Sequence, residues 1–271
     1  MNPIRPVALL VVAALFSPCL TASAHTRADA EKDPVLKAML TELDRSKSDL
    51  QLKDFAKPFF IQYRIEEIDN LEIKAEFGAV SQSHRGNGRV ARVTVRVGDY
   101  KTDSSGGRGD GSVEMVALED DPIAIRSSLW AATDSAYKNA LAAYAQKQAA
   151  LKQVQTPPQA DDFSKETQLI SLAEPLKLNV DQAAWEARLA HDTGLYRSDP
   201  SVNGNKHEVR YSSGSFTARV TATYLVNSEG TIVRKFAGYY QESIGVGAQA
   251  ADGMRLDRSY STSGTALKDL D

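Results

Sequence analysis

The sequence has 271 residues, is 42% hydrophobic and 25% charged, and carries 32 lysines and arginines against 35 aspartates and glutamates, a formal net charge of −3. This composition is typical of a globular protein and excludes a disordered, collagen-like or multi-span membrane chain. No segment concentrates basic residues, so no nucleic acid partner is expected. The single cysteine, Cys19, excludes an internal disulfide and a zinc site built from several thiolates.

Residues 1–24 have the pattern of an export signal. Arg5 supplies a positive charge, residues 7–16 form an uncharged apolar run, and Ala22-Ser23-Ala24 supplies the small residues that signal peptidase requires. The run is too short to span a membrane, which takes about 20 apolar residues. We therefore expect cleavage before His25 and an exported protein, periplasmic or secreted, with no cysteine and no membrane span. An uncleaved N-terminal anchor is the alternative.

Helical and strand patterns follow the signal. Asp33-Pro34 opens a predicted helix that runs to about Leu52. Residues 59–65, 71–77 and 91–97 then alternate apolar and polar side chains, which predicts three half-buried antiparallel strands. Asn87-Gly88 predicts a hairpin turn, because both central positions of a type I′ turn need positive φ.

A glycine-rich loop and a long helix come next. Residues 104–111 contain too much glycine to order themselves, and a strand is expected at 112–118. Asp120-Asp121-Pro122 predicts the start of a helix over 122–150, since Asp caps free backbone N–H groups and Pro suits the first turn. Trp130 and Tyr137 belong to the stripe, continued by Leu141 and Tyr144, that we expect to face the sheet.

The remaining chain predicts a second helix-and-strand unit. Residues 153–166, with Pro157-Pro158, form the predicted linker between a subdomain at 25–152 and another at 167–271. The second contains a short helix from Asp181 to about His191 with Trp185 on its covered side, a strand at 216–226, a turn at 227–230 and a strand at 231–240. The predicted class is α+β, with antiparallel meander sheets packed against helices in two subdomains.

The residue patterns specify no catalytic, cofactor-binding or metal-binding residue. A protease-type metal site places two histidines and a glutamate on one helix. The histidines are His25, His84, His191 and His207, and only His207-Glu208 begins like such a motif, within a predicted strand. A serine–lysine pair stays open, because no particular pair is singled out.

Other motifs have structural explanations. Residues 245–250 match the dinucleotide pattern G-x-G-x-x-A, but no βαβ unit follows, so a flexible loop is expected there. Arg108-Gly109-Asp110 is a chance adhesion tripeptide in a glycine-rich loop, and Ser213-Gly214-Ser215 is a turn or bulge. The carboxylate pairs Glu66-Glu67 and Asp120-Asp121 are interpreted as a solvated strand edge and a helix N-cap.

Three stretches together resemble a known family. The run from Asp120 to Trp130, continuing through Thr133-Asp134 and Ala136-Tyr137-Lys138, is joined by Asp162-Phe163-Ser164-Lys165-Glu166 and by the later run from Tyr224 to Thr231. These stretches resemble the N-terminal region of exported TldD/PmbA-type proteins, once called modulators of DNA gyrase. The resemblance spans about residues 33–265, nearly the whole chain after the export signal.

The resemblance implies zinc metallopeptidases that act on peptides or unfolded chains, commonly as dimers that enclose the catalytic cleft. Their metal lies on an HExxxH helix, with a cysteine ligand downstream, beyond the N-terminal part. That motif is absent from this sequence, so zinc is expected only in the C-terminal part of the family, and activity of this chain alone is not expected.

The resemblance therefore implies a non-catalytic scaffold or peptide-embracing part of a proteolytic assembly, with a peptide or unfolded polypeptide and a dimer mate or partner subunit as expected partners. The alternative is a stand-alone periplasmic peptide-binding or assembly module without peptidase activity. A complete enzyme with an unrecognised site stays open. Peptides would bind by strand addition at a sheet edge or by clamping by the loops at 104–111 and 245–253. The alternative is that both segments are ordinary surface loops with no role in binding.

Overall fold

The computed structural model describes residues 25–106, 111–153, 160–198 and 208–270, and within them one seven-stranded sheet carries all the strands. The strand order is β3-β2-β1-β5-β6-β4, with β7 also paired to β6. All pairs are antiparallel except the three-residue pair of β4 with β6. The predicted α+β class is thus confirmed. The predicted export signal lies outside the described residues.

The helices and strands have these bounds: α1 Arg27–Ala30, α2 Pro34–Asp49, β1 Phe60–Glu76, β2 Ala79–Arg96, β3 Gly111–Met115, α3 Pro122–Leu151, β4 Ile170–Leu172, α4 Gln182–Gly194, β5 Glu208–Asn227, β6 Ile232–Gln249 and β7 Arg255–Gly264, with 3₁₀ turns at Leu195–Arg197 and Leu267–Leu270. None of the helices in the described ranges combines the length and apolarity that a membrane crossing requires. The predicted two-part division stays a prediction, and the sheet contains strands from both parts.

Each of the three longer helices begins at an aspartate, as the sequence predicts. The Asp33 carboxylate accepts the N–H groups of Val35 and Leu36, 3.0 and 3.1 Å away. The carboxylates of Asp121 and Asp181 do the same at the starts of α3 and α4. Because these contacts satisfy backbone donors that have no partner inside a helix, they fix where each helix starts.

The first hairpin differs from the prediction. The expected strands at 59–65 and 71–77 are one continuous strand, β1, which pairs with β2 over its whole length. The turn lies at Phe77-Gly78, where both residues have positive φ (51° and 85°). Asn87 and Gly88, the predicted turn, lie within β2 opposite Asp69 and Ile68. The turn predicted at Asn87-Gly88 is therefore wrong, because a continuous β2 keeps its hydrogen bonds with β1 unbroken.

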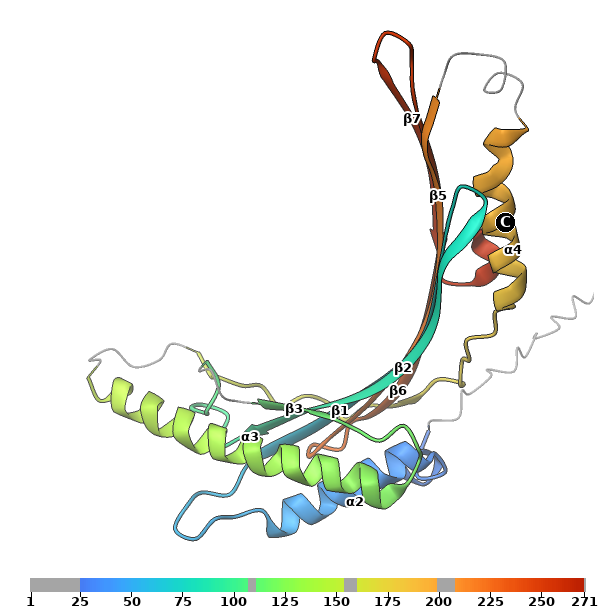
Figure 1. The fold of residues 1–271 in the computed structure, drawn as a ribbon. Helices are drawn as coiled ribbons and strands as arrows, with labels where there is room; N and C mark the ends of the chain where they lie inside the picture. Colours follow the sequence, from blue (N-terminus) through green and yellow to red (C-terminus); the bar gives the residue numbers. More distant parts are fainter. Residues whose placement is uncertain (1–24, 107–110, 154–159, 199–207, 271) are drawn as a thin grey trace, which may run out of the picture.

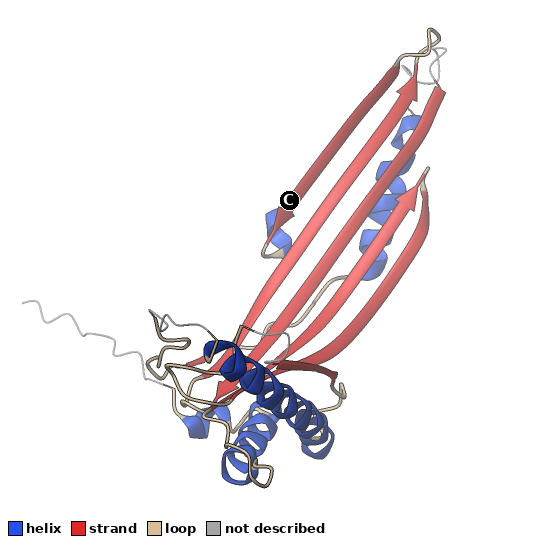
Figure 2. Cartoon of the chain, turned by 90° about the vertical axis from the view of Figure 1, so that its left-hand side faces the viewer, coloured by secondary structure: helices blue, strands red, loops and turns tan. Residues whose placement is uncertain are grey.

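The sheet bends strongly, and both helical layers cover its outer face (Figure 1). Helices α2 and α3 pack on one arm and α4 on the other, and the opposite face of the sheet carries no described helix (Figure 2). The burial pattern of β1 agrees, since successive side chains point to opposite faces. Ile61, Tyr63 and Ile65 belong to the core under α2 and α3, and Leu71 and Ile73, on the same face, belong to the core under α4.

The two tryptophans have different environments. Trp185 of α4 is 8% exposed and stacks on Phe216 of β5 with ring centroids 3.8 Å apart. Trp130 of α3 is 54% exposed, so its predicted place facing the sheet is wrong. The buried side of α3 instead carries mostly smaller residues, which let the helix approach α2 and β2 closely. These residues are Ile125, Leu129, Ala132, Thr133, Ala136, Tyr137 and Ala140.

Candidate functional site

A cleft of about 430 Å³ lies on the outer face of the sheet at the bend, between the starts of α2 and α3 and the segment that leads into α4. We call it the bend cleft. Its floor is apolar or aromatic and its walls are charged, a combination suited to a ligand with both apolar and polar groups. The lining residues are Asp33, Glu67, Asp69, Arg85, Asp120, Pro175, Leu176, Lys177, Leu178, Val220, Ala222, Tyr224 and Phe236.

Arg89 of β2 holds one wall of the bend cleft. It is 2% exposed, and its Nη2 donates to Glu67 at 2.6 Å and to Asp120 at 2.7 Å. Its Nη1 donates to the carbonyl oxygens of Ala117 and Glu119, at 2.9 and 3.4 Å. One buried guanidinium therefore attaches the segment before α3 to the sheet and holds two carboxylates side by side.

Two further arginines fix the other sides. Arg85 bonds Asp69 at 2.8 Å and the carbonyl of Leu178 at 3.1 Å, which ties the segment before α4 to β2. Arg234 of β6 bonds Asp33 at 2.8 Å and the carbonyl of Ala173 at 3.1 Å. The charged walls are thus built from ion pairs that join loops to strands.

Tyr224 of β5 lies in the floor and is 8% exposed. Burial, reinforced by the negative charges of Asp33 and Glu67, raises the pKa of the Tyr224 hydroxyl to about 12. The hydroxyl therefore stays protonated at neutral pH and can both donate and accept hydrogen bonds.

The bend cleft was not predicted from the sequence, although β1 carries a signal for it. The β1 positions on the helix-covered face read Ile65, Glu67, Asp69 and Leu71, so two carboxylates interrupt an apolar series on that face. Carboxylates between two apolar runs on a covered face indicate a break between two cores. The predicted solvated edge at Glu66-Glu67 is therefore wrong, because β1 is a central strand. The N-cap interpretation of Asp120-Asp121 is correct for Asp121.

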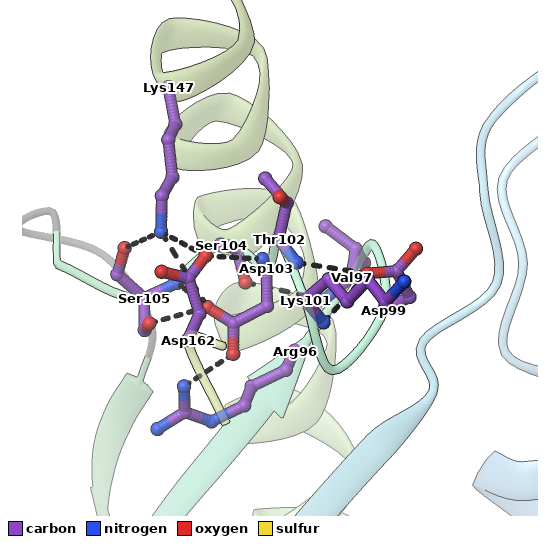
Figure 3. Close-up of polar contacts among 10 residues, drawn as sticks. All are labelled: Arg96, Val97, Asp99, Lys101, Thr102, Asp103, Ser104, Ser105, Lys147 and Asp162. Carbon is purple, nitrogen blue, oxygen red and sulfur yellow. Dashed lines mark hydrogen bonds and ion pairs between the residues drawn. The ribbon is translucent and has the colours of Figure 1, made fainter. Parts of the chain in front are cut away.

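A second polar cluster orders the first part of the glycine-rich loop (Figure 3). Asp103, fully buried, accepts hydrogen bonds from Arg96 Nη1 at 2.6 Å and from the backbone N–H and hydroxyl of Ser105. Lys147 of α3 donates to Asp162 at 2.6 Å and to the Ser105 carbonyl at 3.1 Å. The expectation that residues 104–111 lack order is wrong for Ser104 and Ser105, while residues 107–110, including the Arg108-Gly109-Asp110 tripeptide, lie outside the described residues.

This cluster has the chemistry of a structural support. The Ser105 hydroxyl is hydrogen-bonded to Asp103, and the Lys147 ammonium is bonded to the Asp162 carboxylate and to a backbone carbonyl of the same loop. A serine–lysine mechanism needs a neutral amine that accepts the serine proton. Neither printed hydrogen bond of Lys147 goes to the Ser105 hydroxyl, since its Nζ donates to the Asp162 carboxylate and to the Ser105 carbonyl oxygen. We therefore interpret Lys147 as an anchor between α3, the loop and the segment at Asp162.

The Asp103 cluster predicts a pH-dependent contribution to stability. Burial alone would raise the pKa of Asp103, but the hydrogen bonds from Ser105 and Arg96 outweigh it and hold the pKa below its usual value. Because the folded-state pKa is depressed, the stabilisation is present above the unfolded pKa and is lost as pH falls through the folded one. Asp103→Asn should lower the free energy of unfolding by about 2 kcal/mol at neutral pH, and the difference from wild type should shrink below about pH 4.

Urea unfolding across that pH range measures this difference. Asp134→Asn, which removes the exposed pair with Lys138, is the control and should change stability by less than about 0.5 kcal/mol. A deficit of Asp103→Asn that stays constant down to low pH would contradict the assignment.

None of the hydrogen bonds described above involves a histidine, although His25 lines a shallow pocket together with Asp33. His191 bonds Asp192 at 3.0 Å at the exposed end of α4, and His84 lies in β2. His207 is outside the described residues. No group of three or more histidines, cysteines or carboxylates that could hold a metal ion occurs in the described ranges.

The glycine motifs lie in strands and not in loops. Residues 245–249 belong to β6, so the predicted flexible loop is wrong there. A Cβ added at Gly247 would lie 2.2 Å from Tyr211 Cε1, so glycine is needed to admit that ring. Gly214, predicted in a turn or bulge, lies within β5, and a Cβ there would lie 3.1 Å from Leu189 and Thr193 of α4. These glycines allow close packing.

Solved structures similar to this chain come from three organisms. TldE from Thermococcus kodakarensis is 10% identical with a TM-score of 0.47, over 85% of this chain and 43% of that protein. A modulator of a DNA gyrase from Thermotoga maritima is 13% identical with a TM-score of 0.44, over 78% and 41%. One from Bacteroides thetaiotaomicron is 9% identical with a TM-score of 0.48, over 86% and 45%.

The similarity is to a part of each protein. The chain spans less than half of the length of each of these three structures. Two of the three carry the name modulator of DNA gyrase, the older name of the family that the sequence resembles, and the third is named TldE. No family model matches the sequence, and no curated protein matches it either.

Proposed function

We propose that this chain is a non-catalytic, polypeptide-binding part of an exported proteolytic assembly and that the bend cleft receives the polypeptide. The observation that carries the proposal is the cleft itself, with Val220, Ala222 and Phe236 in an apolar floor and charged side chains on its walls. An unfolded segment offers both kinds of group, since apolar side chains alternate with backbone donors and acceptors. The family resemblance supports the proteolytic setting, and the export pattern supports the location.

The bend cleft is a better candidate than the two predicted loops. The described start of the loop at 104–111 is held by the Asp103 cluster, and 245–249 is part of β6. Strand addition stays an open mode, because the outer edge of β7 and the Ala79–Gly88 part of β2 pair with no further strand among the described residues.

Phe236→Ala is expected to weaken peptide binding about tenfold, because aromatic anchors in such sites carry more than their share of affinity. The probe is a fluorescein-labelled unstructured peptide with leucine and phenylalanine residues, and fluorescence anisotropy gives its Kd. Tyr239→Ala is the matched control, since residue 239 lies on the opposite face of the same strand. Its Kd should stay within about twofold of wild type.

The absence of saturable binding by the wild-type protein would contradict the proposal. An equal loss from Phe236→Ala and Tyr239→Ala would move the site away from the cleft. The stand-alone alternative is separated by concentration-dependent sizing, because a chain that lacks its assembly partner should self-associate through exposed apolar surface, whereas an independent module should stay monodisperse.

A further inference from the structure

We infer that the bend cleft recognises a primary ammonium group of the bound polypeptide, either a lysine side chain or the N-terminal amine. The inference rests on the proposed function and names the chemical feature that the cleft selects. Its basis is a set of three oxygen acceptors, from Glu67, Asp120 and Tyr224, that line the cleft and come from three different segments of the chain. Burial raises the pKa of the Tyr224 hydroxyl, and the two carboxylates are near enough to it to raise that pKa further.

The two carboxylates are held close together with one oxygen each to spare. Glu67 Oε2 and Asp120 Oδ1 accept hydrogen bonds from the same nitrogen of Arg89, at 2.6 and 2.7 Å. Glu67 Oε1 and Asp120 Oδ2 accept no hydrogen bond from any described residue. Because Arg89 is buried beneath them, it orients both carboxylates before any ligand arrives.

Tyr224 supplies the third acceptor, and the unpartnered hydroxyl of this buried side chain supports the site independently of the two carboxylates. The residue is more than nine-tenths buried, lines the cleft, and its hydroxyl makes no hydrogen bond with a described residue. Among the described residues, the side-chain atoms that are fully buried and have no hydrogen-bond partner are Arg64 Nε, Arg96 Nε and Glu242 Oε1. The Tyr224 hydroxyl has no partner among the described residues and is not one of these atoms, so its oxygen is not fully buried and can be reached from the cleft. Tyr224 is the diagonal neighbour of Glu67 across β1 and β5, a spacing that long side chains bridge.

The donor that fits is an ammonium. Such a group has three N–H donors and no acceptor, which matches three oxygens. The charges at this end of the cleft are those of Asp33, Glu67 and Asp120 against the guanidiniums of Arg89 and Arg234, which leaves it net negative. The remaining basic groups are Arg85, which bonds Asp69, and the exposed Lys177 on the rim.

The experiment compares three peptides of one apolar sequence by fluorescence anisotropy. The first has a free N-terminus and no lysine, the second is N-acetylated with one lysine, and the third is N-acetylated with Nε-acetyl-lysine. We expect the first or the second to bind about tenfold more tightly than the third, because hydrogen bonds to a charged group are stronger than neutral ones. Whichever of the first two peptides binds more tightly identifies the source of the ammonium group.

Variants locate the preference. Glu67→Gln and Tyr224→Phe should each reduce it to about twofold or less, while Glu66→Gln, on the opposite face of β1, should leave it intact. Thermal melting of each variant confirms that it is folded.

Equal binding of all three peptides to the folded wild-type protein would overturn the ammonium inference and leave the proposed function standing. An equal effect of Glu66→Gln and Glu67→Gln would also overturn it. Failure of every peptide to bind would contradict the proposed function and the inference together.

Discussion

Trp185→Ala should lower the free energy of unfolding by about 4 kcal/mol, whereas Trp130→Ala should lower it by less than about 1 kcal/mol. Trp185 fills the core between α4 and the sheet and stacks on Phe216, so its removal leaves a cavity. Trp130 has more than half of its surface in solvent and leaves none. Urea unfolding of the two variants under identical conditions measures both values.

The two variants distinguish the structure from the sequence pattern, because that pattern predicts a covered position for both tryptophans. Equal losses, or a larger loss from Trp130→Ala, would contradict the packing of α3 on the sheet. The two cores also predict where the damage appears, since Trp185 belongs to the core of the α4 arm and should leave hydrogen-exchange protection under α2 and α3 less affected.

Arg89→Met should lower the free energy of unfolding by about 3 kcal/mol, because it removes every hydrogen bond of a buried guanidinium that joins the segment before α3 to the sheet. The acceptors are two carboxylates and two backbone carbonyls of the segment before α3. Arg92→Met is the matched control, since its side chain is 59% exposed and its contact with Glu66 spans 4.0 Å. That control should change stability by less than about 0.5 kcal/mol.

The same variant should weaken peptide binding, because Arg89 orients the wall of the bend cleft. Arg89→Lys should restore little of either property, since an ammonium has three donors in place of the five of a guanidinium and cannot reach all four acceptors. Chemical denaturation and peptide titration together measure both effects. Wild-type stability in Arg89→Met would contradict the structural role of the buried guanidinium.

Local signals in the sequence were sufficient to predict where the helices start and which strand residues lie on the helix-covered face. Asp33, Asp121 and Asp181 cap helices because capping involves residues only two or three positions apart. Alternation in β5 correctly places Phe216, buried, on the covered face, because the period of a strand is independent of its partners.

Features set by distant contacts were not predictable in the same way. Asn87-Gly88 has the composition of a turn, yet pairing with β1 keeps it extended. Arg89 joins Glu67 to Asp120 across 22 and 31 positions of sequence, so the bend cleft exists only once the sheet and α3 are assembled. The interruption of the apolar series of β1 by Glu67 and Asp69 was the one local sequence signal for the bend cleft.

Photo-crosslinking tests most directly whether a polypeptide occupies the bend cleft. A photoreactive amino acid replaces Leu176, 42% exposed in the cleft wall, or Tyr239, 43% exposed on the opposite face. With the fluorescein-labelled peptide present, we expect a covalent adduct from position 176 that excess unlabelled peptide abolishes, and little or none from position 239. Equal adducts from both positions, or an adduct from position 239 alone, would contradict polypeptide binding in the cleft.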